Sequence, residues 1–286
     1  MPLYEVEGKT DAGEAGGYVN AETGRVLIKV EKGKQPERLD RVLVAAHRGA
    51  NRAAPENTLA AIRKAVEFGA DLVEIDIRQT KDGRLVLMHN ATLEKTTNGQ
   101  GTVRDKTLEE LKELDAGSWF GPEFQGERIP TLEEVFDELR GNAYPDFDLK
   151  SASPEVFVAA LRAEREKTPD LFENSGLYCS NLELRRRVVE LEPRLRVRHT
   201  VRNGELGLAS VLSEFDPSLV NVEWGDFTEG LIRKIHLAGK KAVVNTHGRH
   251  DTEFKMKAAI EVGADIIMTD QVDLLATLLR ETSPRE

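Results

Sequence analysis

Hydrophobic positions from residue 41 onward alternate between two kinds of pattern. Short runs rich in Val, Ile and Leu, typical of buried strands, alternate with longer segments in which apolar residues recur every three or four positions, typical of amphipathic helices. The predicted strands are 42–46, 72–77, 143–149, 177–179, 195–199, 219–222, 242–245 and 266–269. The predicted helices are 58–68, 131–139, 154–167, 182–191, 204–215, 228–238, 252–262 and 272–280.

Glycines follow three of the helical runs directly, at Gly69, Gly239 and Gly263, as is usual where helices end. Eight strand–helix units in one chain of this size predict an α/β fold, the closed parallel (β/α)8 TIM barrel. An open, doubly wound sheet is the alternative. It is disfavoured because no GxGxxG fingerprint follows a predicted strand.

Two segments lie outside the repeat. Residues 1–38 are expected to form an N-terminal extension that plugs or covers one edge of a catalytic barrel at 39–286; within it, 18–20 and 25–30 should pair as a hairpin around 21–24. Residues 90–130, rich in Thr, Gly and charge, are expected to form an insertion after the second strand that covers the active face.

Composition narrows the range of partners. Fifty acidic residues against forty Lys and Arg give a net charge of -10, without the basic stripe that a nucleic-acid binder needs. No apolar run approaches the roughly 18–20 residues of a membrane span. The polar first 20 residues predict a cytoplasmic protein, or a periplasmic or secreted one if the chain is a processed form. The single cysteine, Cys179, excludes an internal disulfide and is predicted to lie in the core.

Two carboxylates two positions apart suggest a cation site. Glu74 and Asp76 point to the same side of their strand, whereas Val73, Ile75 and Ile77 point to the other and can pack on helices. Burying two like charges is costly unless a cation compensates them. That cation is either a neighbouring Arg or Lys, or a hard divalent ion with oxygen ligands.

The third strand adds Asp148 as a further carboxylate and Lys150 as a positive charge for phosphate oxygens. A negatively charged protein that acts on a phosphodiester must supply such local positive charge. The turn at 81–84, with Asp-Gly at its centre, sets Asp76 opposite His89 if it is a two-residue hairpin. His89 should then lie on the same face as the carboxylates.

His47 ends the first predicted strand, where barrel enzymes carry catalytic groups. Arg48 follows directly, and Gly49 allows the backbone to approach a ligand closely. Glu56 and Asn57 open the next helix. Two histidines at strand ends beside a carboxylate pair indicate catalytic roles for both.

At these positions the chain strongly resembles the glycerophosphodiester phosphodiesterase family, over about residues 42–275. The matching pieces are His47-Arg48-Gly49, Pro55-Glu56-Asn57-Thr58, Glu74-Ile75-Asp76, Lys81-Asp82-Gly83, His89, Thr92-Leu93, Thr96-Thr97-Asn98-Gly99, Gly101, Asp148-Leu149-Lys150 and Thr269-Asp270. The resemblance implies metal-dependent hydrolysis of a small glycerophosphodiester to sn-glycerol 3-phosphate and an alcohol.

The resemblance also implies residue roles. One divalent cation, calcium or magnesium, would be held by Glu74, Asp76 and Asp148, and Glu56 would assist at the metal or orient its ligands. His47 and His89 would be the general acid and base. Arg48 and Lys150 would hold the phosphate. The further substrate-side candidates are Glu56, Asn57, Trp224 and His247.

Four departures from the family pattern are visible. Asp148 stands where the family usually has Glu, Asn90 where it often has Asp, and Lys95 where an Arg often precedes the Thr-Thr pair. Asn245-Thr246-His247 replaces a frequent Trp-Thr near the seventh strand. The last departure affects the alcohol side of the pocket more than the chemistry.

Several alternatives remain open at this level. Water can attack the phosphate directly, or the glycerol 2-hydroxyl can attack first to give a cyclic phosphate. A lyase-type or lysophospholipase D-like relative is a second candidate, and a non-catalytic binder of glycerol phosphate a third. The sequence decides neither the metal, the alcohol nor which histidine is the acid, and both a monomer and a homodimer fit.

Overall fold

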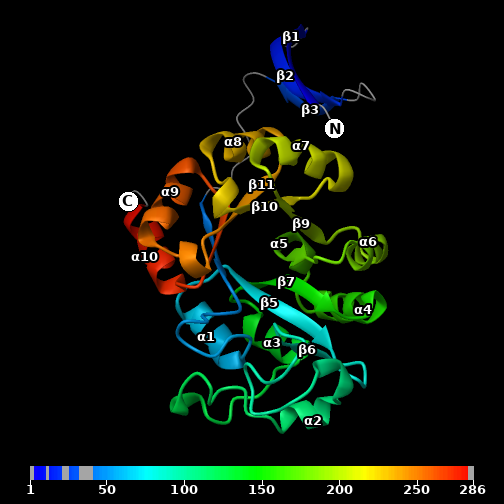
Figure 1. Ribbon diagram of the computed structural model, residues 1–286, viewed down its shortest axis with the longest axis vertical. Coiled ribbons are helices and arrows are strands. Elements are labelled where there is room, and N and C mark those ends of the chain that lie inside the picture. The colour runs from blue at the N-terminus through cyan, green and yellow to red at the C-terminus, as the bar shows by residue number, and fades with distance from the viewer. Residues whose placement is uncertain (1–2, 11–12, 21–25, 32–40, 283–286) are drawn as a thin grey trace. The chain divides into compact units, whose positions relative to one another are not determined.

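The computed structural model describes residues 3–10, 13–20, 26–31 and 41–282 (Figure 1). Its larger sheet has the strand order β4-β12-β11-β10-β9-β8-β7-β5-β6, and an additional β4–β5 pairing closes it. Eight of these strands are parallel and have helices between them, so the predicted TIM barrel is confirmed and the open sheet was the wrong alternative.

The barrel elements match the predicted segments closely. The strands are β4 (Leu43–Ala46), β5 (Leu72–Gln79), β7 (Tyr144–Ser151), β8 (Gly176–Tyr178), β9 (Arg196–Val201), β10 (Leu219–Glu223), β11 (Lys241–Asn245) and β12 (Ile266–Thr269). The helices between them are α1 (Leu59–Glu67), α3 (Leu132–Leu139), α4 (Pro154–Arg165), α6 (Leu182–Leu191), α7 (Gly204–Phe215), α8 (Glu229–Leu237), α9 (Glu253–Val262) and α10 (Val272–Thr282).

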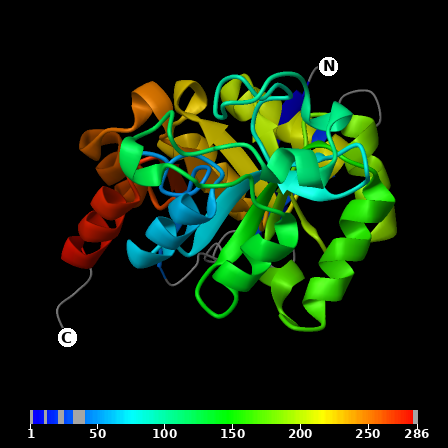
Figure 2. The same cartoon turned by 90° about the horizontal axis from the view of Figure 1, so that it is seen from below.

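Contacts divide the chain into two compact units, and one of them comprises residues 43–197, 247–253 and 268–286. In this unit α1 packs against α3, and α4 packs against α6 (Figure 2). Side-chain caps fix where the helices begin: Thr131 starts α3 with a full capping box, and Ser153 accepts a hydrogen bond from the first turn of α4. The alternation predicted for β5 is present, because Val73 and Ile75 are fully buried on one side of the strand and the carboxylates lie on the other.

The insertion after the second strand has a small core of its own. The insertion, residues 90–130, follows β6 (Leu85–Leu87) and contains α2 (Leu108–Lys112) and the 3-10 turns η1 (Val103–Asp105) and η2 (Pro122–Phe124). Its buried residues pack on one another and on Val86 and Met88 of the β6 segment; they are Leu93, Val103, Leu111, Ala116 and Ile129. The sequence pattern did not predict α2, nor α5 (Leu171–Asn174) of the barrel, because both span less than two helical turns.

The predicted register of the β5–β6 hairpin was wrong by one residue. Ile77 pairs with Leu87, so Met88 and not His89 lies opposite Asp76. The turn has three residues, 81–83, closed by a hydrogen bond from the Thr80 N–H to the Arg84 carbonyl. Gly83, at φ +83°, occupies the left-handed position that a three-residue hairpin loop requires.

The second compact unit comprises residues 1–42, 198–246 and 254–267. It contains a separate antiparallel sheet, β1 (Leu3–Thr10), β2 (Gly13–Asn20) and β3 (Val26–Glu31), in the order β1-β2-β3. The pairing of β2 with β3 is the predicted hairpin, whose turn lies outside the described residues; β1 was not predicted. The predicted domain boundary at residue 38 and the covering role of residues 1–38 stay predictions.

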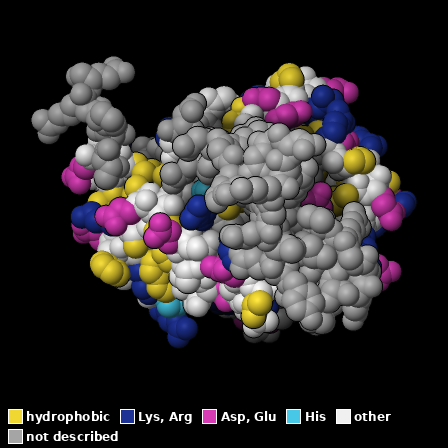
Figure 3. Space-filling model, turned by 90° about the horizontal axis from the view of Figure 1, so that it is seen from above, with side chains coloured by type: hydrophobic (Ala, Val, Ile, Leu, Met, Phe, Trp, Pro, Cys, Tyr) yellow, Lys and Arg dark blue, Asp and Glu magenta, His cyan; other side chains and the backbone are white. Residues whose placement is uncertain are grey.

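The described surface has no strongly one-signed region in the view of Figure 3, where Lys and Arg side chains are interspersed with Asp and Glu. Among the described residues, no helix has both the length and the apolar character needed to cross a membrane. Cys179 is buried, as predicted.

Candidate active site

Three buried carboxylates meet on two neighbouring strands, β5 and β7. Asp76 on β5 is the register partner of Asp148 on β7, and Glu74 lies two residues before Asp76 on the same face. One ligand oxygen from each of the three lies within 4.8 Å of the others. Buried carboxylate oxygens at this spacing are a donor set that suits a hard divalent cation, which binds oxygen at about 2.0–2.6 Å.

Asp76 is held by groups from three directions. Lys150 Nζ lies 3.0 Å from Asp76 Oδ1, and Arg48 Nε lies 3.5 Å from Oδ2. Asn57 donates from Nδ2 to Asp76 Oδ2 at 2.7 Å and accepts from the Asp76 N–H at 3.0 Å. Burial raises the pKa of Asp76, but the charges of Lys150 and Arg48 and the Asn57 hydrogen bond outweigh it, so the pKa is lowered.

Lys150 bridges two of the carboxylates, because its Nζ also lies 2.6 Å from Asp148 Oδ2. Burial alone would lower the pKa of Lys150, but the charges of Asp76 and Asp148 raise it above its ordinary value. The ammonium is therefore a fixed positive charge at the carboxylate cluster. Its side chain remains partly exposed, which leaves it accessible to a ligand.

The segment after β4 turns sharply to bring Arg48 to the same place. Arg48 has a left-handed backbone, with φ +56°, and its N–H donates to Glu74 Oε2 at 2.9 Å. Its guanidinium donates from Nη1 to Glu56 Oε1 at 3.1 Å. Glu56 is in turn 3.5 Å from Lys95 Nζ of the insertion. Glu56 therefore connects the insertion to the arginine beside the carboxylates.

Gly49 makes this turn possible, and its replacement gives a test. At φ +79°, an added Cβ would lie 2.8 Å from the Ala61 carbonyl carbon and Cβ. Gly49→Ala is expected to lower the free energy of unfolding by about 2 kcal/mol or more, from backbone strain plus steric overlap. Gly69→Ala is the matched control, because Gly69 has φ +90° but no atom within 4 Å of the added Cβ; we expect about 1 kcal/mol there. Urea unfolding measures both, and equal losses would show that close packing against Ala61 is unimportant.

His47 is oriented by a carboxylate that the sequence analysis did not assign a role. Its Nδ1 lies 2.7 Å from Asp270 Oδ1, which also accepts from Asn51 Nδ2 at 2.6 Å. Burial raises the pKa of Asp270, but His47, the Gly248 N–H and Asn51 lower it well below its ordinary value. Asp270 is therefore an ionised partner of His47. The ring of His47 also stacks on the ring of His247.

His89 lies two residues after β6 and directly follows Met88, whose N–H donates to the Asp76 carbonyl at 2.9 Å. Its Nδ1 lies 2.8 Å from Asn90 Oδ1. Burial lowers the pKa of His89, and the charges of Arg48 and Lys150 lower it further, against the raising effects of Asp76 and Asn90. His89 is therefore one residue from a backbone contact with Asp76, and the charges of the cluster act on its pKa.

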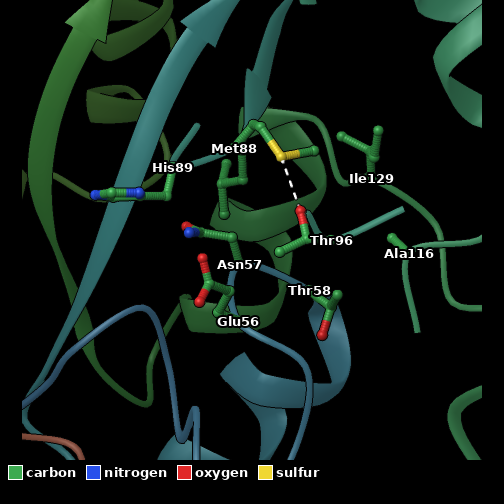
Figure 4. Close-up of a pocket in the computed structure, with 9 residues that line it drawn as sticks. Glu56, Asn57, Thr58, Met88, His89, Thr96, Ala116 and Ile129 are labelled. Atoms are coloured by element: carbon green, nitrogen blue, oxygen red, sulfur yellow. Dashed lines mark hydrogen bonds between the residues drawn. The ribbon is translucent and has the colours of Figure 1, made fainter. Parts of the chain in front are cut away.

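The insertion supplies one wall of the pocket next to His89. Figure 4 shows His89, Asn57 and Glu56 on one side and apolar groups on the other. The apolar side includes Met88 and Ile129 from the insertion core. The cavity volume is about 10 Å³, enough for about one water molecule. A polar wall with the ionisable groups thus faces a preformed apolar wall.

Trp224 and Asn245 belong to the other compact unit. There the Trp224 ring stacks on Phe227 at 4.6 Å, and Lys255 Nζ lies 5.1 Å from its centroid. Asn245 donates to Glu223 Oε1 at 2.7 Å. The predicted contact of Trp224 with substrate stays a prediction.

The structure brings most of the predicted residues together and adds several. One connected set contains the carboxylates and the groups that contact them: Glu74, Asp76, Asp148, Lys150, Arg48, Glu56, Asn57 and His89. His47 precedes Arg48 directly in the chain, and its ring stacks on that of His247. Asp270 and Asn51 were missed. The signal for Asp270 was its position directly after Thr269, the last residue of the last strand, whereas Asn51 carried none.

A TIM barrel with an acidic cluster, two histidines, an arginine and a lysine at the strand ends has the groups of a phosphoric diester hydrolase. The sequence model of the glycerophosphoryl diester phosphodiesterase family matches residues 47–274. The chain is 35% identical, over 84% of its length and 99% of the relative, to a glycerophosphodiester phosphodiesterase of Caldanaerobacter subterraneus subsp. tengcongensis. The chain therefore belongs to the glycerophosphoryl diester phosphodiesterase family, and it is an enzyme, a hydrolase of phosphoric diesters.

Solved structures agree. A glycerophosphodiester phosphodiesterase from Agrobacterium tumefaciens superposes with a TM-score of 0.74 and 30% identity, covering 82% of this chain and 99% of that one. An Oleispira antarctica phosphodiesterase, solved with the product sn-glycerol-3-phosphate, superposes with a TM-score of 0.73 and 27% identity, covering 84% of this chain and 97% of that one.

Proposed function

We propose that this protein hydrolyses small glycerophosphodiesters to sn-glycerol 3-phosphate and an alcohol, with a divalent cation and with His47 and His89 as the acid–base pair. The observation that carries the proposal is the carboxylate cluster bridged by Lys150, with His89 directly after Met88, whose N–H binds the Asp76 carbonyl. The product seen in the Oleispira relative supports the choice of substrate class.

Glu74, Asp76 and Asp148 would hold the cation, calcium or magnesium, which when bound supplies Lewis-acid stabilisation of charge on the phosphoryl oxygens. Arg48 and Lys150 would bind the phosphate through charge-assisted hydrogen bonds. Asn57 and Glu56 would act on these groups more than on substrate, because Asn57 binds Asp76 and Glu56 binds Arg48.

The partners of the two histidines differ, and we use this difference to assign their roles. His89 has a lowered pKa and a neutral partner in Asn90, so it is held unprotonated near neutral pH and would act as the general base. His47, bound to the ionised Asp270, would protonate the leaving alkoxide. The base removes a proton either from water or from the glycerol 2-hydroxyl, and product analysis separates these routes.

A substrate panel tests the proposed function. Glycerophosphodiesters of choline, ethanolamine, glycerol and inositol should release sn-glycerol 3-phosphate, detected enzymatically, after the stripped protein is reloaded with calcium or magnesium. Phosphorus NMR distinguishes the monoester from a cyclic phosphate that persists. No turnover of any diester with either metal would leave the alternative of a non-catalytic binder, and a stable cyclic product would identify a lyase-type reaction.

Asn90 gives a prediction on pH dependence. A general base must be unprotonated, so kcat/KM rises as pH rises through the pKa of His89. Asn90→Asp places a carboxylate 2.8 Å from Nδ1 and should raise that pKa by about 1 unit, which moves the rise in kcat/KM to higher pH. Asn142→Asp, on an exposed turn, is the control and should leave the profile unchanged. A shift to lower pH in Asn90→Asp would contradict the assignment of His89 as the base.

A further inference from the structure

The loop at residues 247–251, which we call the His247 loop, covers one face of the His47 ring. The centroids of the two imidazoles are 4.2 Å apart, and their planes differ by 24°. The Gly248 N–H donates to Asp270 Oδ2 at 2.7 Å, while Oδ1 of the same carboxylate contacts His47 Nδ1 at 2.7 Å. One carboxylate thus fixes both an edge of the His47 ring and the loop that carries His247.

The far end of the His247 loop is also anchored at the end of β12. The buried Asp251 accepts from Thr269 Oγ1 at 2.6 Å and from the Asp270 N–H at 3.0 Å. Gln271 Nε2 donates to the Asp251 carbonyl at 2.6 Å. Because both ends of the loop are bound to the same strand end, the backbone that carries His247 is held next to His47.

A histidine that transfers a proton needs a fixed ring plane as well as a fixed tautomer. The hydrogen bond that Asp270 Oδ1 accepts fixes Nδ1 but allows the ring to tilt about that contact. A flat ring stacked on the other side removes this freedom.

We propose that His247 is a positioning residue for His47, acting through its ring face and not through a hydrogen bond to substrate. The proposal rests on the assignment of His47 as a catalytic residue in the proposed function. It also gives a role to His247, which belongs to the Asn245-Thr246-His247 segment that replaces the family's Trp-Thr. Because the ring face is what matters, another flat side chain should replace His247, whereas a small one should not.

Two substitutions at this position test the proposal. His247→Ala should lower kcat about 10- to 100-fold with little change in KM, the cost of a misplaced catalytic group. His247→Phe should restore most of that loss. His250→Ala, in the same loop but with its ring bound to Arg249 Nε at 3.0 Å, is the control and should behave like the wild type. The Tm of each variant shows whether the fold is retained.

A double-mutant cycle shows whether His247 acts through His47. In a His47→Ala background, His247→Ala should cause no further loss of turnover. The proposal would be overturned if His247→Ala lowered turnover as much in the His47→Ala background as in the wild type. It would also be overturned if KM rose equally in His247→Ala and His247→Phe, because that would mean direct contact with substrate.

Nitrogen-15 NMR of the histidine side chains gives a readout that does not depend on turnover. The His47 ring signals should change in His247→Ala, return towards the wild type in His247→Phe and stay unchanged in His250→Ala. Unchanged His47 signals in His247→Ala would overturn the proposal. Full turnover by His47→Ala would instead refute the acid–base assignment, whatever the NMR result, so the two failures are distinguishable.

Discussion

Replacing either His47 or His89 by alanine is expected to lower turnover about 10²- to 10⁴-fold while the fold is retained. Each imidazole is held by a specific partner, Asp270 for His47 and Asn90 for His89, which is the arrangement expected of proton-transferring groups. Turnover of glycerophosphocholine and the Tm of both variants are measured together, with His250→Ala as the matched histidine control. Wild-type turnover in either folded variant would refute its role.

The leaving group separates the two roles. A glycerophosphodiester of 4-nitrophenol releases a stable anion that needs no proton, so the general acid is dispensable with this substrate. His47→Ala should therefore recover much of its rate on the nitrophenyl diester, whereas His89→Ala should remain slow on both substrates. The reverse pattern would exchange the assignments of acid and base.

The second large effect is expected when the cation is removed or its binding residues are changed. Treatment with a chelator should abolish turnover, and added calcium or magnesium should restore it. Asp76→Asn should weaken cation binding more than about 100-fold, because it replaces a ligand and alters the groups around the other two. Isothermal titration calorimetry measures binding without reference to activity.

Glu133→Gln is the control for Asp76→Asn, because it neutralises an exposed carboxylate on α3. It should leave both the cation Kd and turnover unchanged. Undiminished cation binding by Asp76→Asn would show that the carboxylate cluster is not the metal site. Full turnover of the stripped wild type would show that the reaction does not depend on a metal.

Local patterns were sufficient to predict the barrel. Each strand–helix unit carries its own apolar period, and the alternation along β5 places Glu74 and Asp76 opposite the buried Val73 and Ile75. The register of the β5–β6 hairpin was predicted wrongly because the sequence Asp-Gly occurs in both two-residue and three-residue loops. In the structure Gly83 takes the left-handed position of a three-residue loop.

Residues that act through distant contacts were harder to find. Asp270 is 223 positions from His47, and their hydrogen bond depends on β12 pairing with β4 when the barrel closes. Asn51 lies in an irregular turn that no period describes. Asn90 was visible as a departure from the family pattern, but its contact with His89 depends on a side-chain orientation that the sequence does not specify.

The insertion's separate core has a consequence for how the substrate preference of such an enzyme changes over evolutionary time. Ala116 and Ile129 belong both to that core and to the pocket wall next to His89. Substitutions among the neighbouring apolar residues can therefore move this wall while the strands that carry the ionisable groups stay in place. The scaffold therefore separates changes in the shape of the pocket beside His89 from changes in the ionisable groups, so the pocket lining can vary while those groups are kept.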